Sequence, residues 1–296
     1  MVTFNRPDTT KQVFEKIKEL KPQKLYIYSD APREGHENDG IKVAETRSIF
    51  EEIDWDCDVH RSYQIKNLGC GPGVSHAINW VFQNEEMAII LEDDCVPHLS
   101  FFSFCKEMLL KYKDDTRIMH IAGTRWSQEY KLDDCDYFFS RIGHIWGWAT
   151  WRRAWSNYDF QMSSWNEYRA SKKTLQIFND RRIAKFWDGA FEYVFLQEKK
   201  HTWDYQWQFA LFANDGLSIV PNVNLISNIG TTGVHASNNA SPNLFKKTFR
   251  WQNNEKHPSS KLPNLEFERY HMHNHFPVKY PLRKRLTGAI QRLFKQ

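Results

Sequence analysis

The sequence predicts an α/β protein with a mostly parallel central sheet flanked by helices and a helical appendage at its C-terminal end. Three observations favour this class. Apolar segments of strand length alternate with amphipathic segments over residues 1–91, the segment 87–91 ends in three consecutive acids, and 41% of the 296 residues are hydrophobic against 26% charged. Strands that alternate with helices form crossover units around a parallel sheet.

The first four strands and three helices are expected in strict alternation. The predicted strands are 2–4, 24–29, 56–63 and 87–91. The predicted helices are 7–20, 39–53 and 74–82. The first helix is opened by Pro7 and Asp8, and its apolar residues recur at helical spacing.

After residue 97 the alternation continues and then loosens. Helices are predicted at 100–112, 182–198 and 204–214, and strands at 117–122, 137–141 and 217–220. Residues 151–170 are rich in Trp and polar residues, and an Asn- and Gly-rich loop is expected at 222–241.

Charge and cysteine usage restrict the setting. The net charge is +4, yet residues 279–296 hold six basic residues and no acid, so the remaining body sums to −2. This balance argues against a nucleic-acid partner for the body and predicts that the basic tail has a partner of its own.

The five cysteines are scattered without a C-x-x-C pair, which favours a reducing cytoplasm over a disulfide or zinc framework. Neither a signal peptide nor a membrane span is expected.

The acid triplet Glu92-Asp93-Asp94 is the strongest chemical feature. It directly follows the apolar run 87–91. A solvated turn is one interpretation, because loops after strands are often acidic. The alternative is a Mg²⁺ or Mn²⁺ site that holds the diphosphate of a substrate, since these cations prefer oxygen ligands and open α/β sheets bind ligands at the carboxyl ends of their strands.

A glycine-rich segment precedes the predicted helix 74–82. Gly69, Gly71 and Gly73 give G-x-G-x-G, which differs from the dinucleotide-binding G-x-G-x-x-G and follows the third strand. A plain turn and a helix N-terminus whose amides approach a phosphate both remain open. The high aromatic share, 15% with 12 Trp, fits either sugar-binding platforms or an aromatic core.

Several short motifs in register resemble the nucleotide-sugar glycosyltransferases of the GT-A fold. They are the first strand with Asn5-Arg6-Pro7, the Ser29-Asp30 strand end, Leu91-Glu92-Asp93-Asp94, Trp146-Gly147-Trp148, Trp203-Asp204-Tyr205-Gln206-Trp207, and Pro221-Asn222-Val223-Asn224 through Gly230, Gly233 and His235. The pattern is similar to that of N-acetylglucosaminyltransferase I and bacterial polysaccharide-type transferases. It covers about residues 1–240, with no match across 151–201.

The resemblance implies a metal-dependent glycosyltransferase with a Rossmann-like GT-A domain. The catalytic domain would span 1–240, with a nucleotide-sugar half at 1–125 and an acceptor half at 126–240, followed by an extension at 241–296. It implies Mn²⁺ or Mg²⁺, a nucleoside-diphosphate sugar donor with UDP-sugar as the expected form, and a glycan or lipid-linked acceptor.

The resemblance also implies roles for individual residues. Asp94 and His235 correspond to metal ligands, Asp93 to a ribose or metal-shell carboxylate, and Glu92 to a contact with the donor sugar. Asp30 corresponds to the acid near the base or ribose, and Arg6 to a basic residue near the diphosphate. Thr3, Asn5 and Gly71 complete the expected donor-binding set. Asp204 takes the place of the general base of an inverting reaction.

Alternatives stand beside these roles. Asp204 can be an N-cap or first-turn acid, and His235 an exposed loop residue. A sugar nucleotidyltransferase or phosphohydrolase also uses clustered acids, although residues 2–7 lack the glycine-rich loop of the former. A non-catalytic sugar-binding module would not need Asp204. The alternating histidines His271, His273 and His275 are not expected to be ligands.

The basic tail predicts an amphipathic helix at 281–295. Its apolar residues recur at helical spacing opposite five Arg and Lys residues. Contact with an anionic membrane surface and docking on the catalytic domain are both open. The expected location is the cytoplasm, with peripheral attachment to the inner face of the membrane as the variant that the tail allows.

Overall fold

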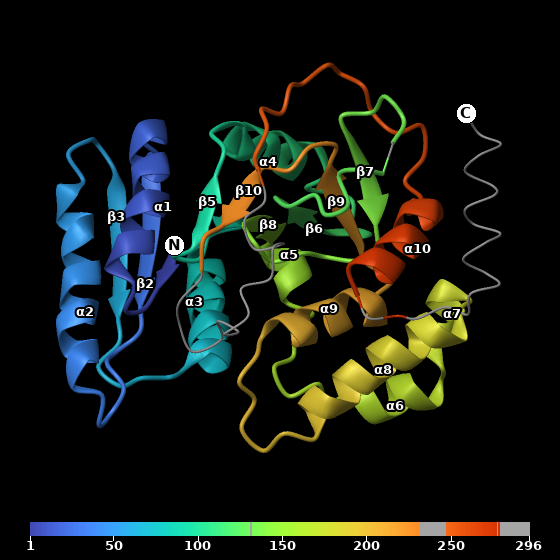
Figure 1. The fold of residues 1–296 in the computed structure, drawn as a ribbon, viewed down its shortest axis with the longest axis horizontal. Helices are drawn as coiled ribbons and strands as arrows, with labels where there is room; N and C mark the ends of the chain where they lie inside the picture. The colour runs from blue at the N-terminus through green and yellow to red at the C-terminus, as the bar shows by residue number, and fades with distance from the viewer. Residues whose placement is uncertain (131, 231–246, 277, 279–296) are drawn as a thin grey trace.

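The computed structural model describes residues 1–130, 132–230, 247–276 and 278, and it confirms the mixed α/β class (Figure 1). A parallel sheet contains β1 (Val2–Thr3), β2 (Lys24–Ser29) and β3 (Asp58–Tyr63) in the order β1-β2-β3. A five-stranded sheet has the order β4-β8-β6-β9-β7. Its strands are β4 (Met87–Ile90), β8 (Trp148–Trp151), β6 (Ile118–Ala122), β9 (Leu217–Pro221) and β7 (Tyr137–Ser140).

The two sheets continue into one another through a parallel bridge between Val2 and Glu92. Because β8 is antiparallel to both β4 and β6, and β9 is parallel to β6, the strands β1, β2, β3, β4, β6 and β9 share one direction. The predicted mostly parallel arrangement therefore holds. The antiparallel β8 lies between β4 and β6, the antiparallel β7 forms the edge beside β9, and β8 was not predicted.

Helices cover both faces of the parallel sheet because β2 alternates its side chains. Leu25 and Ile27 pack toward α1 (Pro7–Leu20) in one apolar cluster with Phe14. On the opposite face the Tyr26 ring contacts Trp80 of α3 (Cys70–Asn84) with ring centroids 5.0 Å apart. Figure 1 shows α2 (Glu37–Ser48) at the outer edge beside β3. The helix predicted at 39–53 is observed at 37–48 and is followed by a 3-10 turn, Ile49–Glu52.

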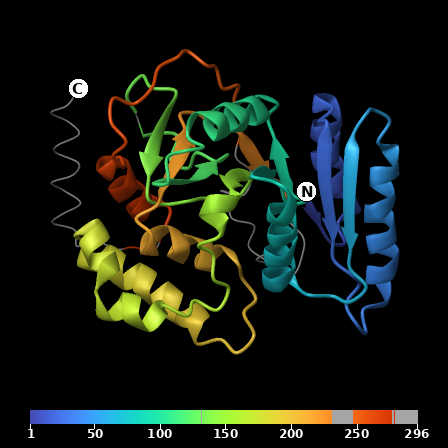
Figure 2. The ribbon, with the colours of Figure 1, turned by 180° about the vertical axis from the view of Figure 1, so that it is seen from behind.

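A helical lobe includes the end of the Trp-rich region 151–170, in which no element was predicted. It contains α6 (Trp165–Ala170), α7 (Lys173–Phe178), α8 (Arg181–Phe195) and α9 (Asp204–Ala213), and the short α5 (Arg152–Trp155) leads from β8 toward it. The helices predicted at 182–198 and 204–214 correspond to α8 and α9. Trp165, Phe191 and Phe209 pack edge to face at its centre, with centroids 5.5–6.0 Å apart. Figure 2 shows the lobe below the five-stranded sheet. Much of the aromatic content is therefore core.

Four further elements complete the described chain. They are α4 (Ser100–Lys111), the antiparallel pair of β5 (Cys95–Pro97) with β10 (Ile226–Asn228), and α10 (Leu265–Asn274). The last helix is tied to the sheet because the buried Glu268 carboxylate accepts hydrogen bonds from the backbone N–H and the guanidinium of Arg141. Neither β5, β10 nor α10 was predicted, since two are very short and the third has no clear apolar stripe.

Two predictions fall outside the described residues: His235 and the tail helix 281–295. Within the described ranges, each helix is too short or too polar to cross a bilayer.

Candidate active site

The acid triplet lies where the two sheets join. β4 ends at Ile90, Leu91 is buried, and the backbone N–H of Val2 donates to the Leu91 carbonyl at 2.9 Å. This contact places the carboxyl end of β4 beside the end of β1. The expected position of Glu92, Asp93 and Asp94 at a strand end in the middle of the sheet is thus observed.

Arg6 links two of the three acids. Its Nη1 donates to Asp94 Oδ2 at 2.7 Å, and its Nη2 forms an ion pair with Asp93 Oδ1. The Phe4 backbone N–H also donates to Asp93 Oδ2, at 3.3 Å. Burial raises the pKa of Asp93, and the positive charge of Arg6 opposes that rise. Arg6 is therefore a direct counter-charge to two of the three acids.

Glu92 is the least compensated of the three. Its Oε1 is buried and has no hydrogen-bond partner within the described part of the chain. Burial raises the pKa of Glu92 to about 8, and the charges of Asp94 and Asp93 add to that effect. An orphaned carboxylate oxygen beside two further carboxylates is a donor set that suits a hard divalent cation. The residues therefore fit Mn²⁺ or Mg²⁺.

A second segment covers Asp94. β10 pairs with β5, and the chain then passes directly over the acids: Ile229 N–H donates to the Asp94 carbonyl at 2.8 Å and Asn228 Nδ2 to Asp94 Oδ1 at 3.3 Å. Gly230 packs so closely that a Cβ there would collide with Asp94 Oδ2. Sequence reasoning noted Gly230 only as part of a motif and missed Asn228, which no local pattern indicated.

The glycine-rich segment is the start of a helix. α3 begins at Cys70 instead of residue 74, because Gly69 adopts φ 78° before it and Pro72 is tolerated in the first turn. Gly71 is required for packing, since a Cβ there would lie 2.7 Å from the Thr202 carbonyl oxygen. The close approach brings the segment that precedes α9 against the N-terminus of α3.

Asp204 belongs to the same electrostatic cluster as the acids. Its negative charge is among those that raise the pKa of Glu92. The pKa of the Cys70 thiol is raised to about 12, first by desolvation of the sulfur and then by the charges of Glu92 and Asp204, although Cys70 as a whole residue is exposed. The charges of the triplet and of Asp204 therefore both act on the start of α3.

Asp204 is the first residue of α9, as the first-turn alternative expected, and it is partly buried. It also lines a cavity of about 210 Å³. Trp146, Tyr205 and Gln208 line the same cavity. Trp148 is fully buried and stacks on Trp203 with centroids 5.6 Å apart. The Trp146-Gly147-Trp148 motif thus has one tryptophan in the core and one at a cavity.

The other expected donor residues make internal contacts. The Thr3 hydroxyl donates to the Tyr28 carbonyl at 3.0 Å, and Asn5 Nδ2 donates to Asp39 Oδ1 at 2.7 Å. The Asp30 carboxylate accepts hydrogen bonds from the backbone N–H groups of Ala31, Leu68 and Gly69. Burial raises the pKa of Asp30 against these hydrogen bonds. Asp30 therefore holds the turn that leads into α3.

A larger cavity, of about 280 Å³, has none of the three acids in its lining. It is lined mainly by apolar side chains of β2, α3 and β4, among them Leu25, Ile78 and Ile89. Its chemistry does not match that of the triplet, and size alone does not make it the functional site.

The similarity of this chain to known proteins is low. The chain matches no family model and no curated protein. Among solved structures, it is similar to the mannosyltransferase PcManGT from Pyrobaculum calidifontis in complex with GDP-Man and Mn²⁺. The TM-score is 0.37 and the identity 14%, and the match covers 72% of this chain and 68% of that one. A similarity of this size assigns neither an activity nor a substrate.

Proposed function

We propose that the protein is a metal-dependent glycosyltransferase that moves a sugar from a nucleoside-diphosphate donor to a hydroxyl of a glycan or lipid-linked acceptor. One observation carries the proposal: the charge of Asp204 at the start of α9 acts on Glu92 of the acid triplet, and Asp204 itself lines a cavity. The sequence resemblance to GT-A glycosyltransferases assigns complementary roles to those same residues.

The triplet serves the donor side. Asp93 and Asp94, with Glu92 beside them, would hold Mn²⁺ or Mg²⁺. The bound ion would neutralise the negative charge that grows on the leaving diphosphate. Arg6 contacts both aspartates and would add a second positive charge close to the diphosphate. The N-terminus of α3, whose free amides favour anions, lies against the same cluster.

Asp204 serves the acceptor side. A carboxylate on the cavity wall can remove the proton from an acceptor hydroxyl as it attacks the anomeric carbon, provided that the two oxygens approach within about 2.6–3.2 Å. The neighbouring Trp146 and Tyr205 offer aromatic surfaces to a sugar ring. In this scheme Asp204 accepts a proton and forms no bond to the sugar, so the product has inverted configuration.

The test is a panel of nucleotide sugars incubated with the protein, with Mn²⁺ or with excess chelator, and analysis of the released product. Release of a nucleoside diphosphate that requires the cation supports the proposal. Release of pyrophosphate or phosphate would instead indicate a nucleotidyltransferase or phosphohydrolase. Asp94→Asn should abolish the release, whereas Asp134→Asn, whose carboxylate is 97% exposed, should leave it unchanged.

A further inference from the structure

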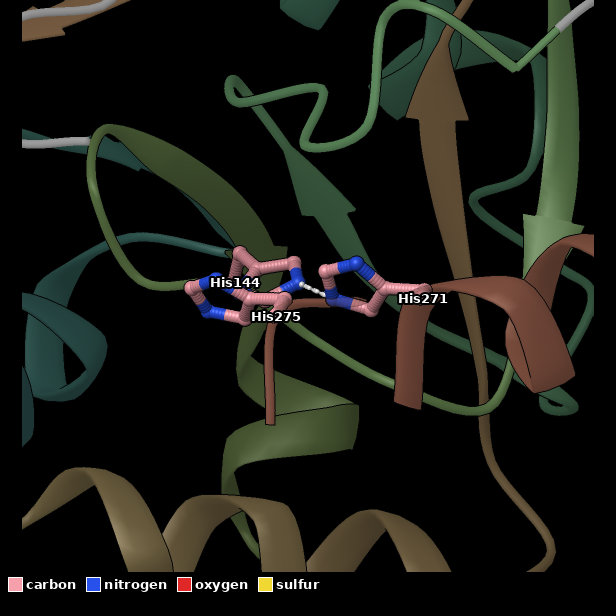
Figure 3. A group of neighbouring side chains, drawn as sticks. All are labelled: His144, His271 and His275. Carbon is pink, nitrogen blue, oxygen red and sulfur yellow. Dashed lines mark hydrogen bonds between the residues drawn. The ribbon is translucent and has the colours of Figure 1, made fainter. Parts of the chain in front are cut away.

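Three histidines from two segments of the chain come together, as Figure 3 shows, and two of them line the cavity that contains Asp204. His144 lies in the loop between β7 and β8, His271 near the end of α10, and His275 at the C-cap of that helix. One ring nitrogen of each lies within 4.8 Å of those of the other two. His271 and His275 are four residues apart and share one side of the helix. The sequence did not indicate this arrangement, because His144 is remote from the other two in the chain.

The three rings are in contact with one another. His144 Nε2 and His271 Nε2 are 2.8 Å apart and share a hydrogen bond. The His271 and His275 rings stack with centroids 4.9 Å apart. His271 is fully buried, and its second nitrogen, Nδ1, lies 3.4 Å from the Ser127 hydroxyl. A metal-binding histidine commonly donates its other N–H to an oxygen in this way, which fixes its tautomer and orientation.

We propose that His144, His271 and His275 form a binding site for Zn²⁺ or a similar transition metal. Imidazole nitrogens suit such ions, while Mg²⁺ and Mn²⁺ prefer the oxygen ligands of the acid triplet. Tetrahedral Zn²⁺ with bonds of about 2.0–2.1 Å needs ligand nitrogens roughly 3.3 Å apart. The pair at 2.8 Å would have to open slightly, and the His275 nitrogen would have to move closer to the other two. The metal would take the lone pairs of both Nε2 atoms in place of the hydrogen bond between them.

The location gives the site its consequence. His144 and His275 line the cavity that also contains Asp204, so a fourth coordination position would face that cavity. The bound metal would tie α10 to the loop before β8 and fix one wall of the cavity. Trp126 strengthens this wall, because its ring packs on His275 with centroids 3.9 Å apart. The inference does not depend on the proposed glycosyl transfer.

The test is zinc binding by the full chain after chelator treatment, measured by metal analysis and by competition with a zinc indicator. We expect one tightly bound Zn²⁺ per chain and the visible absorption bands of tetrahedral Co²⁺ when cobalt replaces zinc. His144→Ala and His275→Ala should each weaken zinc binding at least tenfold. Ser127→Ala should weaken it by about 10–100-fold, the usual effect of losing a supporting contact.

Two controls separate this site from others. His273→Ala removes a histidine on the same helix, outside the cluster, and Asp94→Asn alters the acid triplet; both should retain the zinc. Because His271 is fully buried, the decisive variants are at the partly exposed His144 and His275, with folding checked by circular dichroism. If the wild type binds no zinc, or if the cluster variants bind it as tightly as His273→Ala, the proposal is overturned.

Discussion

Arg6 donates a hydrogen bond from Nη1 to Asp94 Oδ2 at 2.7 Å, so a strand-end arginine holds the acid for which a metal role is proposed. The same guanidinium also pairs with Asp93, and its side chain is 25% exposed. Without a cation, Arg6 is the main balance to three neighbouring carboxylates. A substitution in this cluster should therefore alter the free energy of unfolding, its pH dependence and the affinity for a cation together.

Arg6→Met tests that connection. Loss of the guanidinium leaves Asp93 and Asp94 without their counter-charge, so the free energy of unfolding at pH 8 should fall by about 1–3 kcal/mol, less than for a fully buried pair because Arg6 is partly exposed. Saturating Mn²⁺ should restore part of the loss. Urea unfolding with and without Mn²⁺ measures both. Arg117→Met, which removes a guanidinium from a side chain that is 59% exposed, should lower stability less than Arg6→Met does. Equal losses in the two variants, or no response to Mn²⁺, would contradict the prediction.

Gly230→Ala should impair cation binding. An added Cβ would collide with Asp94 Oδ2 and lie 3.1 Å from Arg6 Nη1, so either the carboxylate or the chain after β10 must move. We expect a clear rise in the Mn²⁺ concentration needed for half-maximal thermal stabilisation. Gly189→Ala is the matched control, because its Cβ would meet nothing within 4 Å and it lies inside α8. That change should stabilise the protein by up to about 1 kcal/mol. Unaltered Mn²⁺ dependence in Gly230→Ala would show that the segment adapts without disturbing Asp94.

The acid triplet was predictable because its signal is local: an apolar strand followed at once by Glu92, Asp93 and Asp94. The parallel strands were predictable for the same reason. Helices of four to six residues, such as α5 and α7, are too short to show a period. Long-range relationships were not predictable in detail. Nothing near Asn228 in the sequence shows that the pairing of β10 with β5 brings it to Asp94.

Glu92→Gln should reduce the pH dependence of stability. The folded-state pKa of Glu92 is raised to about 8 from an ordinary value of 4.5, chiefly by burial. Between these values the folded protein binds more protons than the unfolded chain, so the stability contributed by protonated Glu92 is complete below about pH 4.5 and is lost as pH rises through 8. The metal-free wild type should therefore lose more stability than Glu92→Gln between pH 5 and 8. Urea unfolding at both pH values checks this. Parallel curves for the two proteins would show that Glu92 is not the titrating group.

Asp204→Asn should separate catalysis from folding. If Asp204 is the general base, the amide cannot accept the acceptor proton, and turnover should fall by about 10²–10⁴-fold while donor affinity stays unchanged. Asp204 is also the first residue of α9, so losing its charge should cost only about 0.3–1 kcal/mol of stability. Asp215→Asn, at a 70% exposed carboxylate, serves as the control and should retain turnover. Initial rates measure turnover, a donor titration measures donor affinity, and NMR of the product shows its anomeric configuration. A product that keeps the donor's anomeric configuration, or a variant with full turnover, would leave Asp204 with a helix-terminal role alone.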